Sequence, residues 1–317
     1  MKNAKASGAL GVGGGKKTSV FTSIRKDYYL YLLFVPTLIY YIIFVYWPMY
    51  GVIIAFKDYN IIDGILGSPW VGLKHFKTFF NSIYCGRLIR NTLILNLYDL
   101  AFNFTSPIIF ALLLHELKDG LFKKAAQTIS YLPHFISTVI VASMVISFLQ
   151  YDTGLINNII AALGGQRRMF LSEPQYFRMV YTLMNFWKNL GWGSIIYLAT
   201  MSGINTELYE ACSIDGGGKL RQMWHVTLPG IRIAIVIQLI LKMGHLLSVG
   251  YESIILLYNT ATYETADVIS TYVFRRGILD AKYSFSTAVN IFQSVIGLIL
   301  VVTTNKICRK LSEVSLW

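Results

Sequence analysis

Long apolar segments recur along the chain, and turn or charged residues separate them. A membrane-spanning helix needs about 20 mostly apolar residues. Pro36 and Pro48 fall inside the first segment, so we expect that helix to be kinked. The pattern predicts an all-α membrane protein with six transmembrane helices. The expected spans are Tyr28–Phe56, Leu88–Leu114, Thr128–Tyr151, Tyr176–Met201, Ile231–Tyr258 and Tyr283–Ile307.

The composition agrees with a membrane protein. Of the 317 residues, 55% are hydrophobic and 14% are charged, whereas soluble domains average about 25% charged residues. The net charge of +12 fits basic residues that flank spans and meet lipid headgroups, so we expect no nucleic-acid partner. Cys85, Cys212 and Cys308 have neither a disulfide pattern nor metal-ligand spacing, and we expect no metal site.

The distribution of lysine and arginine predicts the orientation. Basic residues are denser in the N-terminal segment, in the short 118–124 loop and after the last span, which favours the cytoplasm for these parts. An even number of spans then gives an N-in/C-in topology. We expect a flexible basic cytoplasmic tail at 1–27 and a six-helix domain at 28–307. The domain includes a cytoplasmic loop at 203–230, and a C-terminal cytoplasmic tail follows at 308–317.

Polar residues occur at helical spacing inside four of the expected spans. Such residues are costly in lipid and usually face a bundle interior or a wet cavity. We therefore expect the bundle to enclose a polar path, although helix packing explains any single residue equally well. In that second interpretation, Lys188 pairs with Asp99 and Lys242 snorkels. The path candidates are Asn96, Asp99, Asn103, Asn185, Lys188, Trp192, Lys242, His245, Glu252, Asn290 and Gln293.

Two glycine-lysine pairs invite comparison with a phosphate-binding loop. That motif requires serine or threonine after the lysine, but Lys17 follows Gly15-Lys16 and Leu220 follows Gly218-Lys219. We find no Ser-His-Asp or metal constellation either. The sequence therefore predicts that this chain is not an enzyme and does not itself hydrolyse ATP.

The loop between the fourth and fifth spans has the pattern of two short helices. Asn205 is a good N-cap and Gly216 a good C-cap. A second helix is expected from Lys219, and Pro229 ends it before the fifth span. Each helix has an apolar side. That side fits either a groove on a partner protein or the headgroup surface of the membrane, and the residues alone leave both open.

The loop sequence EACSIDGGGKLRQMWHVTLPG, from Glu210 to Gly230, resembles the EAA loop of permease subunits from bacterial binding-protein-dependent ABC sugar importers. Cys212 and Gly217 replace alanines of that pattern, and Met223 stands where phenylalanine is common. The resemblance extends to the stretches YWPMYGVIIAFKDYN, GSPWVGLKHF, RNTL and YLPHFIS. It is closest to LplB-like polysaccharide or oligosaccharide permeases. The residues that it assigns to ATPase coupling are Glu210, Ala211, Asp215, Gly216, Gly217, Met223, Trp224, Leu228 and Pro229.

The resemblance implies a type I ABC importer permease fold in the bacterial cell membrane. It also implies a second homologous permease, two ATPase subunits that bind ATP and Mg, and an extracytoplasmic sugar-binding protein. That protein would dock on the loops at 57–87, 152–175 and 259–282. A secondary transporter or channel subunit for a polar solute is the alternative, but we see neither inverted repeats nor broken mid-membrane helices.

The saccharide itself is not identified by the sequence. Basic residues inside the expected spans and in the outer loops are compatible with an acidic saccharide, and equally with lipid or the binding protein. These residues are Lys188, Lys242, Arg167, Arg168, Arg275 and Arg276.

Overall fold

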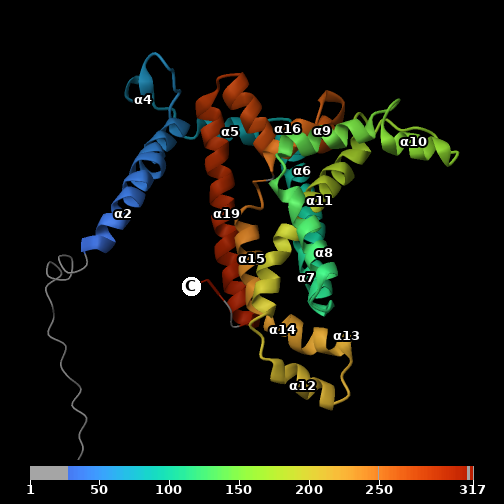
Figure 1. The fold of residues 1–317 in the computed structure, drawn as a ribbon. Helices are drawn as coiled ribbons and strands as arrows, with labels where there is room; N and C mark the ends of the chain where they lie inside the picture. The colour runs from blue at the N-terminus through green and yellow to red at the C-terminus, as the bar shows by residue number, and fades with distance from the viewer. Residues whose placement is uncertain (1–27, 249, 313–314, 317) are drawn as a thin grey trace, which may run out of the picture. The chain divides into compact units, whose positions relative to one another are not determined.

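The computed structural model describes residues 28–248, 250–312 and 315–316, so the tail expected at 1–27 lies outside the described residues. Within these ranges every regular element is helical (Figure 1), and the one strand-like feature is an isolated antiparallel bridge between Lys57 and Trp70. The chain divides into a unit that ends at Ile53 and a unit that begins at Ile54.

The first unit is a helix that changes type along its length. It consists of α2 (Tyr28–Tyr41), the π-helical η1 (Ile42–Tyr46), α3 (Trp47–Met49) and the beginning of η2 (Tyr50–Phe56). Pro48 lacks the amide hydrogen that an α-helix would donate four residues back, which accounts for the irregular turns around it. The expected first span, Tyr28–Phe56, is therefore helical throughout.

In the second unit, the helix of the expected second span runs from Cys85 to Glu116. It comprises α6 (Cys85–Tyr98), the π-helical η3 (Asp99–Phe104) and α7 (Thr105–Glu116). Pro107 has no amide hydrogen for the carbonyl of Asn103, so the α-helical ladder is interrupted at this point. The wider π turn lies in the middle of the span, where such irregularities often accompany function.

The expected third span is not one continuous helix. Helix α8 (Leu121–Tyr131) and the 3₁₀ turn η4 (Leu132–Phe135) meet α9 (Thr138–Leu149) at a bend of 99°. Pro133 lies inside the 3₁₀ turn, and the extended Ser137 starts a new helix. The expected span over Thr128–Tyr151 therefore contains a sharp bend. Helix α10 (Leu155–Ala162) follows α9.

Helix α11 (Pro174–Met201) packs along α7 in the middle of the second unit (Figure 1). Glycine permits two close approaches on this helix. A side chain at Gly191 would collide with the carbonyl of Ser130 on α8, and one at Gly193 would lie 2.9 Å from the ring of Pro107. The expected fourth span, Tyr176–Met201, matches α11 to within two residues.

The expected fifth span is also broken. Helix α15 (Arg232–Gly244) packs on the last helix, α19 (Tyr283–Ser312), and residues 245–250 separate it from α16 (Tyr251–Leu257). The side chain of Gln293 donates to the carbonyl of Leu247 at 2.7 Å, which satisfies a backbone group that the break sets free. The expected continuous helix over Ile231–Tyr258, and the expected absence of broken helices, were wrong.

Helix α19 continues five residues past the expected end at Ile307. Short elements make up the rest of the unit. These elements are α4 (Gly64–Gly67), α5 (Lys74–Phe80), α12 (Thr206–Ile214), α13 (Lys219–Gln222), η5 (Met223–Thr227), α14 (Leu228–Gly230), η6 (Thr260–Thr262), α17 (Tyr263–Ala266), α18 (Ile269–Phe274) and η7 (Arg275–Leu279).

Among the described residues, three helices are long and apolar enough to cross a membrane, and two bent helix pairs raise the number to five. The expected total of six is not confirmed by this measure, and α11 is the expected span that falls outside it. This helix carries Asn185, Lys188 and Asn189 on its length, which lowers its average hydrophobicity.

Candidate functional site

The loop after α11 folds as the sequence predicts. The side chain of Asn205 caps α12 by accepting a hydrogen bond from the amide of Glu207 at 3.0 Å. Helix α12 ends before Gly216, whose φ of +76° is the left-handed conformation that favours glycine. Helix α13 then starts at the expected Lys219. We call α12 and α13 together the hairpin; Figure 1 shows it at the end of the bundle.

The two helices of the hairpin are joined to each other. Gln222 is buried, and its side-chain amide donates to the hydroxyl of Ser213 at 2.7 Å. A side chain at Gly217 would lie 2.5 Å from the sulfur of Cys212, so only glycine lets the turn close this tightly. The hairpin is therefore one compact unit and not a pair of independent helices.

Polar contacts attach the hairpin to the end of α7. The hydroxyl of Tyr209 lies 3.3 Å from Nε2 of His115 and 3.1 Å from the hydroxyl of Thr227. Lys219 forms a 3.0 Å ion pair with Glu116. Sequence reasoning missed the contacts of His115 and Glu116, because these residues lie far from the loop in the sequence.

The coupling candidates divide into an exposed and a packed group. Trp224 is 64% exposed. Its apolar neighbours Leu220 and Ile214 are also exposed, to 71% and 85%. Met223 and Leu228 pack instead against a cluster that contains Ile108, Met201 and Ile231. Trp224 therefore faces away from the bundle and Met223 faces it. The remaining exposed candidates are Glu210, Ala211, Asp215, Gly216 and Pro229, while Gly217 is buried.

Four of the path candidates line one cavity of about 720 Å³, which we call the central cavity. Asn103 comes from η3, Trp192 from α11 and Lys242 from α15, and His245 follows α15 directly. The predicted polar stripes of three helices therefore converge. Sequence reasoning missed Gln238, which lies one helical turn before Lys242 and lines the same cavity.

An ion pair joins two walls of the central cavity. Lys242 on α15 pairs with Asp99 on η3, and Asp99 also accepts a 2.8 Å hydrogen bond from the amide of Asn103. One interpretation of the sequence paired Lys188 with Asp99. In the structure, Lys188 instead donates to the hydroxyl of Thr138 at 2.5 Å. The buried carbonyl oxygen of the Asn103 side chain has no hydrogen-bond partner among the described residues.

Trp192 is held in place by the break between α8 and α9. The imidazole of His134 stacks on its indole, with ring centroids 4.5 Å apart and planes within 1° of parallel. The carbonyl oxygen of the Asn189 side chain lies 3.2 Å from Nδ1 of the same histidine. His134 was not among the predicted site residues, although it lies in the stretch YLPHFIS that carried part of the resemblance.

The other path candidates lie elsewhere. Asn290 and Gln293 line a second cavity, of about 620 Å³, which we call the α18 cavity because Val273 and Phe274 of α18 form one wall. Asn96 and Asn185 donate to carbonyls of their own helices. Glu252 is exposed on α16. Among the described residues, no group of three or more histidine, cysteine, aspartate or glutamate side chains is arranged to hold a metal ion.

Residues 103–308 match the family described as the binding-protein-dependent transport system inner membrane component. The chain belongs to this family. It is 44% identical over 303 residues to protein LplB of Bacillus subtilis, covering 96% of this chain and 95% of that protein. It is 45% identical over 298 residues to the B. subtilis polygalacturonan/rhamnogalacturonan transport system permease protein YteP, covering 94% and 93%.

A solved structure has the same fold. The bacterial alginate ABC transporter, crystallised in complex with an alginate pentasaccharide-bound periplasmic protein, contains a chain that matches with a TM-score of 0.87 and 42% identity. The match covers 94% of this chain and 99% of that one. These findings confirm the predicted family and the helical type I permease fold. They place the chain among membrane permease components, which are not themselves ATPases.

Proposed function

We propose that this chain is the permease subunit of an ATP-driven importer that moves a carboxylate-bearing oligosaccharide into the cytoplasm. The observation that carries this proposal is the central cavity, which is lined by both the cationic Lys242 and the aromatic Trp192. Relatives named for alginate and for polygalacturonan transport support the acidic class of substrate.

The lining of the central cavity suits such a substrate. The Trp192 indole, one face of which His134 covers, offers apolar surface to a sugar ring. The amides of Asn103 and Gln238 offer donors and acceptors to hydroxyl groups. Lys242 supplies a charge for a carboxylate, and in this cavity its partner in the chain is Asp99. We infer that a substrate carboxylate competes with Asp99 for Lys242, so that binding loosens the link between η3 and α15.

The partners follow from the family. A second homologous permease would complete the path, two ATPase subunits would bind ATP and Mg, and an extracytoplasmic sugar-binding protein would deliver the substrate. The alginate transporter was crystallised with such a periplasmic protein. The exposed apolar surface formed by Leu220 of the hairpin and Trp224 of the adjoining η5 is the surface we assign to the ATPase. The assembly would lie in the bacterial plasma membrane.

The contacts of the hairpin provide a route from the ATPase to the substrate. Tyr209 and Lys219 connect it to the end of α7, and the bend at Ile231 connects it to α15. Helix α7 continues into η3, which carries Asp99, and α15 carries Lys242. Displacement of the hairpin therefore moves both walls of the central cavity, which can close or open it around the substrate.

Uptake by the assembled complex, reconstituted in vesicles with its ATPase subunits and binding protein, tests the proposal. We expect ATP-dependent uptake of a galacturonate trisaccharide and much slower uptake of a neutral galactose trisaccharide of equal length. Equal rates for the two would overturn the acidic class but leave the permease assignment standing. Uptake of either sugar without ATP would overturn the permease assignment itself.

A further inference from the structure

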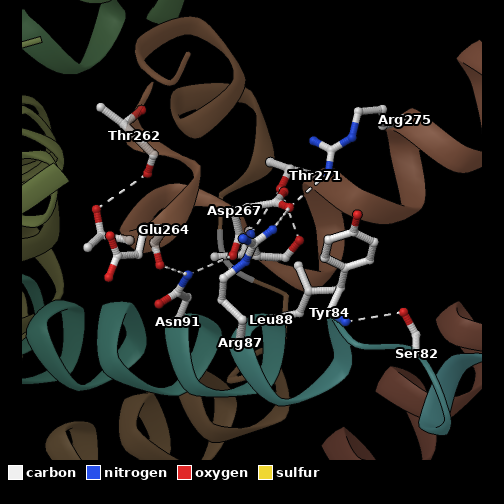
Figure 2. Close-up of polar contacts among 12 residues, drawn as sticks. Ser82, Tyr84, Arg87, Leu88, Asn91, Thr262, Glu264, Asp267, Thr271 and Arg275 are labelled. Carbon is white, nitrogen blue, oxygen red and sulfur yellow. Dashed lines mark hydrogen bonds and ion pairs between the residues drawn. The ribbon is translucent and has the colours of Figure 1, made fainter. Parts of the chain in front are cut away.

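A second cluster of charges lies at the other end of the helix that reaches the hairpin. Arg87 is in the first turn of the 32-residue helix Cys85–Glu116 and Glu116 is in its last, which places them about 44 Å apart at 1.5 Å per residue. Figure 2 shows Arg87 beside Asp267, whose carboxylate is fully buried. That carboxylate accepts hydrogen bonds from Arg275 at 2.8 Å and from Thr271 at 2.9 Å.

The cluster carries more positive than negative charge. Arg87 lies 3.6 Å from the same Asp267 oxygen that Arg275 already occupies, and Arg276 pairs with Asp280 at 2.7 Å. Three guanidinium groups therefore face two carboxylates. Burial acts to lower the pKa of Arg275, but the hydrogen bond and the charge of Asp267 outweigh it, so that the pKa is raised. The excess positive charge is permanent.

The three arginines line a cavity of about 320 Å³, which we call the arginine pocket. Its other lining residues are Tyr84, Tyr263, Tyr272 and Asp280. One buried nitrogen of each guanidinium group, Nε of Arg87, Nη1 of Arg275 and Nε of Arg276, has no hydrogen-bond partner among the described residues. Buried donors are normally paired, and the three residues that carry these unpaired donors all line this one cavity. This arrangement favours a ligand with anionic oxygen atoms.

The tyrosines fix the arginines in position. The guanidinium of Arg87 lies 5.3 Å from the ring centre of Tyr84, and that of Arg275 lies 4.8 Å from Tyr263 and 5.7 Å from Tyr272. These ring faces are covered by cations, so they are not free to stack on a sugar. A ligand would meet preorganised N–H donors, a geometry suited to phosphate and carboxylate groups.

The arginine pocket lies at the ends of two candidate membrane spans. One begins at Cys85, two residues before Arg87, and the other begins at Tyr283, seven residues after Arg276. Exposed apolar side chains adjoin it in the sequence, namely Ile83 (87% exposed), Ile278 (61%) and Leu279 (68%). Cations and tyrosines beside exposed apolar groups are typical of the headgroup region of a bilayer.

We propose that the arginine pocket binds the phosphate of an anionic phospholipid, in the leaflet opposite the hairpin. The transported saccharide would not occupy it, because α18 and η7 separate the pocket from the α18 cavity. Tyr272, Arg275 and Arg276 line the pocket, whereas Val273, Phe274 and Gly277 line the cavity. A lipid held on one face of these helices thus stabilises a wall of the cavity on the other face.

Native mass spectrometry of the assembled complex tests the proposal, after extraction from vesicles that contain phosphatidylglycerol and phosphatidylcholine. The variant R87Q/R276Q removes two guanidinium groups but leaves Arg275 to hold the buried Asp267. We expect retention of phosphatidylglycerol to fall about tenfold or more, as the loss of charge-assisted hydrogen bonds predicts. The control R168Q removes an exposed outer-loop arginine and should retain the lipid as the parent does.

Unchanged retention in R87Q/R276Q would overturn the proposal. Two competitors identify the source of the anion. If inorganic phosphate binds the delipidated complex as tightly as the phospholipid does, the pocket is a site for free phosphate and the lipid assignment fails. If a galacturonate trisaccharide displaces the phospholipid from both the parent and the R168Q control, the pocket belongs to the substrate and the assignment also fails.

Discussion

Lys242 on α15, which lines the central cavity, forms an ion pair with Asp99 on η3. Each of the two residues belongs to a helix that contacts the hairpin or continues from it. The pair therefore joins the two walls whose separation a moving hairpin would change. Its carboxylate is also held by Asn103. Lys242 lines the cavity and its side chain is 35% exposed, so a ligand in the cavity can reach the cation of the pair.

The substitution Lys242→Gln should impair both stability and selectivity. It leaves Asp99 without its cation, which we expect to cost roughly 1–2 kcal/mol, between the values for exposed and fully buried pairs. The double variant D99N/K242Q should regain the melting temperature of the assembled complex. It should nevertheless keep a KM for galacturonate trisaccharide raised about tenfold. Recovery of both properties would make the pair a purely structural feature.

Trp224 and Met223 are adjacent but should give different phenotypes. Both lie in η5, where Trp224 is exposed and Met223 packs against the bundle. We expect Trp224→Ala to weaken retention of the ATPase subunits during purification about thirtyfold, as for an aromatic interface anchor, with little change in the stability of the permease. Met223→Ala should show the reverse, a lower melting temperature with normal retention. The opposite pattern would reassign the contact.

Gly216 and Gly218 provide a matched pair in the turn of the hairpin. Gly216 has φ of +76°, whereas Gly218 has φ of −74° and open space around it. Gly216→Ala should strain the turn by roughly 1–2 kcal/mol and reduce substrate-stimulated ATP hydrolysis. Gly218→Ala should leave it unchanged. Equal activity in the two variants would show that the turn geometry does not matter for coupling.

Gly191 should respond to alanine against the usual trend for helices. Alanine normally stabilises a helix by about 0.5–1 kcal/mol relative to glycine, but a side chain at Gly191 would collide with the carbonyl of Ser130. Gly191→Ala should therefore lower the melting temperature. Gly86→Ala, at an open position of α6, should raise it slightly or leave it unchanged. A stabilised Gly191→Ala variant would contradict the close approach of α8 and α11.

The loop between the first two spans should loosen in acid. Lys74 donates a 2.7 Å hydrogen bond to Asp58 and so holds the pKa of that carboxyl below its ordinary value. A lowered pKa contributes stability above the unfolded value of about 3.9, and this is lost as the pH falls through the folded value. Both side chains are about half exposed, so the effect is small.

Hydrogen exchange of the Asp58 amide, which donates to the carbonyl of Pro69 at 2.9 Å, measures this loosening. After correction for intrinsic exchange, we expect its protection to fall below about pH 4. In Asp58→Asn, protection should not change with pH. A parallel loss of protection in both proteins would exclude the carboxyl as the cause.

The sequence by itself determined the elements that depend on local chemistry. The N-cap at Asn205, the left-handed Gly216 and the start of α13 at Lys219 were all predicted correctly, because caps and turns are set by neighbouring residues. The polar stripes also predicted that Asn103, Lys242 and His245 face an interior, since a polar group in lipid needs one, and these residues line the central cavity. The family followed from the same loop.

Only the tertiary structure decided where helices break and which residues meet. The bend at Pro133 brings α8 and α9 together at 99°. The gap after Gly244 is tolerated because the distant side chain of Gln293 satisfies the freed carbonyl of Leu247. The partner of Asp99 depends on the rotation and depth of three helices, which periodicity does not fix. The choice of Lys242 over Lys188, and of Trp224 over Met223 as the exposed residue, therefore required packing between segments far apart in the chain.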